Sequence, residues 1–129
     1  MVIISVDFDG IIVEDGYWPE TGPALPGAVE VINALHNMGF CIIINSCRVG
    51  VAEMNMIRWL KEYNVDFCHV GVNCRKLIEK YGADCRKISA NVMIDDKSIY
   101  FDRETFSWKD VGITIIEKYG FVERDCNVC

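Results

Sequence analysis

The sequence lacks a hydrophobic run long enough to cross a membrane, because the apolar stretch over residues 1–6 contains Ser5 and stops at Asp7. That stretch has no basic flank either, so we expect no signal peptide and no membrane partner. Positive charge is scarce: the net charge of −6 argues against bulk binding to nucleic acid. Repeats and low-complexity tracts are absent, which favours one domain over residues 1–129.

Proline is confined to positions 19, 23 and 26, so no predicted helix or strand contains one. Together with nearby glycines, these prolines predict a loop or flap over residues 10–26. The seven cysteines are an odd number without a secretion signal, which predicts reduced thiols and a cytoplasmic protein. Cys126 and Cys129 lie in a C-terminal tail of about residues 120–129 and form only one closely spaced pair, which argues against structural zinc. Their role stays open.

Short β-branched or apolar runs alternate with segments of helical periodicity. Helices are predicted after residue 27, after residue 50 and over residues 75–81, because apolar residues recur there every three or four positions. Strands are predicted over residues 2–6, 41–44, 67–70, 91–94 and 113–116. This alternation predicts an α/β domain, a Rossmann-like three-layer arrangement with a mostly parallel five-stranded sheet.

Acidic and polar side chains follow the predicted strands where each strand ends. Asp7 and Asp9 follow the first strand, Ser46 follows the second, and Asp95 and Asp96 follow the fourth. Carboxyl ends of parallel strands share one edge of a sheet, where ligands bind. Clustered carboxylates repel one another unless a cation relieves them, and such oxygen ligands suit Mg²⁺. The alternative for any one aspartate is a polar turn that merely ends a strand.

The Asp-x-Asp spacing suits phosphoryl transfer. It can aim Asp7 at a phosphorus atom as a nucleophile, which forms an aspartyl-phosphate. Asp9 would then protonate the leaving group and later deprotonate the hydrolytic water.

Taken in order, these motifs resemble those of the haloacid dehalogenase (HAD) superfamily of phosphatases and phosphotransferases. That family carries Asp-x-Asp after its first strand, Thr or Ser after the second, a later lysine, and an acidic pair after the fourth. Asp7, Asp9, Ser46, Asp95 and Asp96 match this pattern, and the match spans residues 2 to about 101. The resemblance implies that Asp7, the Asp9 carbonyl and Asp95 hold Mg²⁺, with Asp96 as a further or supporting ligand. It also implies that Ser46 donates to a phosphoryl oxygen.

The same resemblance assigns Lys87 to the charge-compensating lysine, although Lys76 and Lys80 lie close by. Arg48 has two interpretations: it clamps a substrate phosphate bidentately, or it is a solvated residue at a helix entrance.

The segments before the first helix and before Lys87 are too short for a folded cap domain, so the sequence resembles the capless branch of the superfamily. An uncapped site suits a large phosphorylated substrate, or else the flap or a second protomer covers it. Tyr17 and Trp18 would either stack on a ring of the substrate or pack against the domain. The expected activity is Mg²⁺-dependent hydrolysis of a phosphate monoester, on a small molecule or a macromolecule. The rivals are a phosphotransferase and a noncatalytic phosphate-binding or interaction module.

Overall fold

The structure is a computed structural model of the 129-residue chain, and it describes residues 1–120. Cys126, Cys129 and nearly all of the predicted tail therefore lie outside the described residues. Within residues 1–120, four parallel strands form one sheet in the order β3-β2-β1-β4. They are β1 (Ile3–Val6), β2 (Cys41–Ile44), β3 (His69–Val70) and β4 (Val92–Ile94). The α/β class and the parallel sheet are confirmed.

The central strands β1 and β2 are buried along their whole length, as their β-branched sequences predict. Alternation of side chains sends Ile4 and Ile42 into the larger core cluster. Ile3 and Ile43 point into a smaller cluster on the opposite face.

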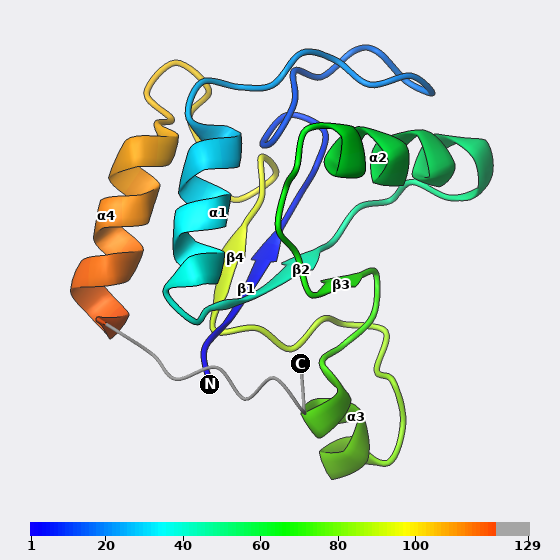
Figure 1. The fold of residues 1–129 in the computed structure, drawn as a ribbon, viewed down its shortest axis with the longest axis vertical. Coiled ribbons are helices and arrows are strands. Elements are labelled where there is room, and N and C mark those ends of the chain that lie inside the picture. The colour runs from blue at the N-terminus through cyan, green and yellow to red at the C-terminus, as the bar shows by residue number, and fades with distance from the viewer. Residues whose placement is uncertain (121–129) are drawn as a thin grey trace.

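In the same part of the chain, three helices connect successive strands (Figure 1): α1 (Ala28–Asn37), α2 (Gly50–Glu62) and α3 (Arg75–Tyr81). A fourth helix, α4 (Trp108–Tyr119), follows β4. Helices α1 and α4 lie side by side and approach closely, because Gly112 leaves room for Val31: a Cβ at Gly112 would lie 2.8 Å from Val31 Cγ1. The Trp108 indole N–H donates to the Ile11 carbonyl over 2.7 Å, which ties α4 to the start of the flap.

The predicted fifth strand over residues 113–116 is wrong, because these residues belong to α4. A short apolar run is compatible with either structure, and the longer window decides in favour of the helix. Trp108 and Ile115 point into the core, whereas Ile113 and Ile116 are more than a third exposed. The Ser107 hydroxyl accepts from the Asp110 N–H and caps the first turn, a helix start that the strand prediction overlooked.

Among the cysteines within residues 1–120, Cys47, Cys68 and Cys85 are free thiols. Cys41 is disulfide-bonded, so the expectation that every cysteine is reduced is wrong. Within residues 1–120, no helix combines the length and the apolar character that a membrane crossing requires.

The strand order fixes where a ligand can bind. The chain runs from β1 outward through β2 to β3, then returns to place β4 on the other side of β1. In open parallel sheets, this reversal leaves a crevice beyond the carboxyl ends of the two strands that flank it. Here those strands are β1 and β4, which end at Val6 and Ile94.

Candidate active site

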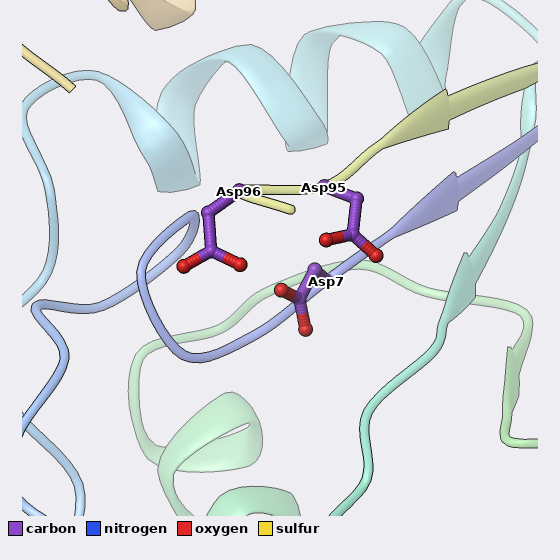
Figure 2. A group of neighbouring side chains, drawn as sticks. All are labelled: Asp7, Asp95 and Asp96. Atoms are coloured by element: carbon purple, nitrogen blue, oxygen red, sulfur yellow. The ribbon is translucent and has the colours of Figure 1, made fainter. Parts of the chain in front are cut away.

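The register of the sheet brings Asp7 beside Asp95. Val6 is paired with Ile94, and the Asp7 N–H donates to the Ile94 carbonyl over 2.9 Å. The residues that leave these two strands are therefore neighbours. Figure 2 shows the carboxylates of Asp7, Asp95 and Asp96 around a common space, and one oxygen from each lies within 4.8 Å of the others.

Backbone amides orient two of these carboxylates. The Phe8 N–H donates to Asp7 Oδ1 and the Lys97 N–H donates to Asp95 Oδ1, each over 2.8 Å. Both bonds are local turns at the end of a strand, so the chain itself aims the side chains.

The Asp96 carboxylate lies beside two cationic side chains and against the backbone of Gly10. Its side chain is 3% exposed, and Oδ2 lies 3.3 Å from Arg103 Nη2 and 3.6 Å from Lys97 Nζ. Gly10 (φ +84°) passes so near that a Cβ there would lie 2.5 Å from Asp96 Oδ2. A glycine is therefore required after Asp9, both for its positive φ and for the space that Asp96 occupies.

Burial, together with the neighbouring carboxyl groups, raises the pKa of Asp7 from its ordinary 3.8 to about 8. Burial is the largest cause, the hydrogen bond with Asp96 is next, and the charge of Asp95 adds to both. The Phe8 amide acts in the opposite direction. Three carboxyl groups that converge on one space fit Mg²⁺ well, since Mg²⁺ takes carboxylate ligands and keeps several waters.

These carboxylates form one wall of a pocket of about 450 Å³. The Asn45 N–H donates to the Val6 carbonyl over 2.8 Å, which brings the residues after β2 to the same edge. The structure thus brings together five of the predicted site residues: Asp7, Asp9, Ser46, Asp95 and Asp96. The lining is completed by residues that the sequence interpretation gave no part in catalysis or metal binding: Asp15, Trp18, Asn45, Cys47 and Lys97.

Arg48 is neither a solvated residue nor exposed to a substrate. Its side chain is 0% exposed, and it makes a bidentate ion pair with Asp9: Nε donates to Oδ2 and Nη2 to Oδ1, each over 2.7 Å. The remaining N–H groups donate to the carbonyls of Pro19, Glu20 and Ala52 over 2.7–3.1 Å. All five guanidinium donors are thus used inside the protein, so none is left for a phosphate.

Arg48 consequently fastens the flap to the domain. Pro19 and Glu20 lie in the flap, and the Asn55 amide of α2 also donates to the Pro19 carbonyl over 3.0 Å. The guanidinium carbon lies 5.0 Å from the centroid of the Trp18 ring, a cation–π contact on the same segment. Asp9, the flap and α2 therefore share one buried cation.

Lys87 is not among the residues that line the pocket. It precedes β4 and enters the strand at its amino end, the edge opposite Asp95, and its carbonyl accepts from the Asn73 amide over 3.2 Å. Lys97 lines the pocket instead, with its ammonium beside Asp96. Its position directly after the Asp95–Asp96 pair is a signal in the sequence that would have identified it.

A solved structure from Bacteroides thetaiotaomicron, described as a conserved protein, has a similar fold. It shares 29% sequence identity with this chain at a TM-score of 0.76, covering 92% of this chain and 93% of that one. No protein-family model matches the chain, and no curated protein matches it.

The raised pKa of Asp7 predicts how stability depends on pH. The folded protein retains a proton on Asp7 that the unfolded chain loses above about pH 4, so stability of the cation-free protein falls as pH rises from about 4 to about 8. Mg²⁺ binds the ionised carboxylates, so its stabilising effect grows over the same range. Thermal melts between pH 4 and 9, with EDTA or with Mg²⁺, measure both effects. Asp7→Asn should weaken both the pH dependence of stability and the stabilisation by Mg²⁺, whereas the control Asp66→Asn should change neither. Equal Mg²⁺ stabilisation of wild type and Asp7→Asn would contradict the metal site.

Replacing Arg48 should destabilise the protein strongly. Arg48→Met leaves Asp9 without its cation and removes the Arg48 donors from three carbonyls, of which Pro19 keeps Asn55 as a donor. This change should cost about 3–5 kcal/mol of unfolding free energy. The matched control is Arg75→Met, since the exposed Arg75–Glu79 pair contributes less than about 1 kcal/mol. Urea denaturation measures the unfolding free energy of both variants. Equally small decreases in Arg48→Met and Arg75→Met would show that Arg48 does not fasten the flap.

Proposed function

We propose that this protein is a Mg²⁺-dependent phosphatase of the HAD superfamily, which hydrolyses phosphate monoesters through an aspartyl-phosphate on Asp7. The observation that carries the proposal is the convergence of Asp7, Asp95 and Asp96 within 4.8 Å, in a pocket that also contains Ser46. Two carboxylates that follow β1 and two that follow β4 would be costly in a site without a cation or an anionic substrate to use them.

Asp7, the Asp9 carbonyl and Asp95 would hold the ion, with Asp96 in support because its Oδ2 already faces Arg103 and Lys97. Bound there, Mg²⁺ would offset the negative charge of the carboxylates and of the substrate phosphate.

Asp7 would attack the phosphorus atom, so that a bond forms between its carboxylate oxygen and phosphorus as the bond to the leaving oxygen breaks. Water would then hydrolyse the aspartyl-phosphate and release inorganic phosphate. The Ser46 hydroxyl lines the same pocket and would donate to a phosphoryl oxygen while its Oγ accepts from the Arg48 N–H over 3.1 Å. Lys97 would take the charge-compensating role that the sequence alone assigned to Lys87.

Asp9 retains the proposed acid/base role under one geometric condition. Both of its oxygens accept from Arg48, so one of these bonds must open for an oxygen to turn toward the leaving group. Asp9 is the more exposed member of the pair, with a side chain 21% exposed, which leaves it room to turn.

Two alternative functions predict a different fate for the phosphoryl group. A phosphotransferase of the same fold would pass the phosphoryl group to an alcohol in preference to water. A noncatalytic binding module would bind phosphate without releasing it from any ester. Asp9 counts against this module, because a binder needs no acid/base.

The first test is metal-dependent hydrolysis. Wild-type protein should release phosphate from 4-nitrophenyl phosphate with Mg²⁺, and EDTA should abolish the release. Asp7→Asn should lower kcat by about a thousandfold or more, since it removes the nucleophile. Asp66→Asn is the matched control and should retain wild-type kcat. Equal kcat in Asp7→Asn and wild type would overturn the role of Asp7, and transfer to added glycerol in preference to water would favour the phosphotransferase.

The second test separates the lysines. Lys97→Met should lower kcat/KM by about tenfold or more, because it removes positive charge beside the acidic group. Lys87→Met should change kcat/KM less than about twofold, since that lysine does not line the pocket. Steady-state kinetics with the same ester measures kcat/KM of both variants. A larger loss in Lys87→Met than in Lys97→Met would assign the charge-compensating role to Lys87.

A further inference from the structure

Trp18 is placed as a binding platform beside the acidic group. Among the described residues, it is the one aromatic side chain that lines the pocket with Asp7, Asp95 and Asp96. It is 54% exposed, whereas the other tryptophans, Trp59 and Trp108, are 6% and 1% exposed. An indole left half uncovered keeps a large apolar area in water, which a ligand with a flat apolar face would remove.

The platform is held to the domain by contacts of Trp18 and of the residue after it. The guanidinium of Arg48 lies 5.0 Å from the ring centroid and is itself fully buried. The next residue, Pro19, has a carbonyl that accepts from Arg48 Nη1 over 2.8 Å and from Asn55 Nδ2 over 3.0 Å. A ring fixed in this way loses little conformational entropy when a ligand stacks on it.

The charge of the pocket points to a need for such a platform. Five carboxylates line it, from Asp7, Asp9, Asp15, Asp95 and Asp96, and Lys97 is the one lining cation among the described residues. A phosphate gains little affinity here beyond what a bound cation supplies, so the rest of the substrate must contribute binding free energy. The pocket volume of about 450 Å³ suits a small molecule with a ring as well as a phosphate.

From these contacts, and resting on the proposed phosphatase activity, we infer that the substrate is a small phosphate monoester whose alcohol carries a flat aromatic ring, and that this ring stacks on Trp18. The ring is joined to the phosphate either through a sugar, as in a nucleoside monophosphate, or through a short linker, as in an arylalkyl phosphate. Stacking is the shared chemistry, and matched substrate pairs distinguish the two sources.

The kinetic test uses pairs that differ only in the ring. Adenosine 5′-monophosphate and ribose 5-phosphate share a primary sugar hydroxyl as leaving group, and benzyl phosphate and cyclohexylmethyl phosphate share a primary alcohol. Wild-type protein should prefer the aromatic member of at least one pair in kcat/KM by about tenfold. Trp18→Leu should remove that preference, Trp18→Phe should keep most of it, and the pair that responds identifies the linker.

Tyr81→Leu is the matched control. Tyr81 is a half-exposed aromatic residue on α3, which lies toward the amino ends of the strands, away from the pocket (Figure 1). This variant should keep the wild-type preference. Thermal melts of every variant exclude loss of folding as the cause.

A second measurement does not need turnover. Trp18 is the accessible one of the three tryptophans, so iodide should quench its fluorescence first. In wild-type protein with Mg²⁺, the phosphonate analogue of the aromatic member of the responding pair, which cannot be hydrolysed, should protect against this quenching, and the phosphonate analogue of its partner should not. Equal protection by both analogues, or protection by neither, would overturn the inference.

The outcomes separate the two proposals. Phosphate release without preference for the aromatic member, unchanged in Trp18→Leu, would overturn the ring platform and leave the phosphatase intact. No release from either pair or from 4-nitrophenyl phosphate, by protein that melts as wild type should, would overturn the phosphatase and with it this inference.

Discussion

Repulsion among carboxylates at one edge of the sheet is the constraint around which the site is arranged. The pairing of Val6 with Ile94 forces Asp7 and Asp95 to emerge as neighbours, and the strands cannot avoid this without losing their register. Cationic side chains relieve part of the repulsion: the buried Arg48 pairs with Asp9, while the exposed Arg103 and Lys97 lie beside Asp96. The repulsion that is left acts between Asp95 and Asp7, whose pKa is raised to about 8. A divalent cation is the natural counterion for this remaining pair.

Arg48 connects this electrostatic problem to the shape of the pocket. The Arg48 guanidinium forms an ion pair with Asp9 and lies over the Trp18 ring. It also holds the flap by donating to the carbonyls of Pro19 and Glu20. Burying a charge so completely is tolerable only because every donor has an acceptor. The geometry of the flap therefore depends on the same residue that holds the proposed acid/base, so shape and charge cannot be altered separately at this point.

How far the sequence was informative depended on the range of the interaction. Buried β-branched runs predicted β1 and β2. The alternation of strands and helices predicted a parallel sheet, and with it that Asp7 after β1 and Asp95 after β4 would lie at one edge. The segment around Ile113 was mistaken for a strand because four apolar residues do not define a period, and the helix cap at Ser107 was overlooked. Arg48 and Lys87 were misplaced for another reason. Whether a cation faces the solvent, a ligand or a buried carboxylate is decided by side chains from distant segments, such as Pro19, and no local spacing encodes it.

The fixed flap also bears on which acceptor the proposed enzyme would use. A phosphotransferase has to keep water away from its aspartyl-phosphate, usually by closing a lid after substrate binding. Here hydrogen bonds to the buried Arg48 fasten the flap without a bound ligand. The rim of the pocket stays open to water, since the Lys97 side chain is 81% exposed and Trp18 is half-exposed. Opening or closing would have to break the hydrogen bonds of Arg48 to Pro19 and Glu20. A site that stays open in this way admits water to the aspartyl-phosphate, which favours hydrolysis over transfer as the proposed chemistry.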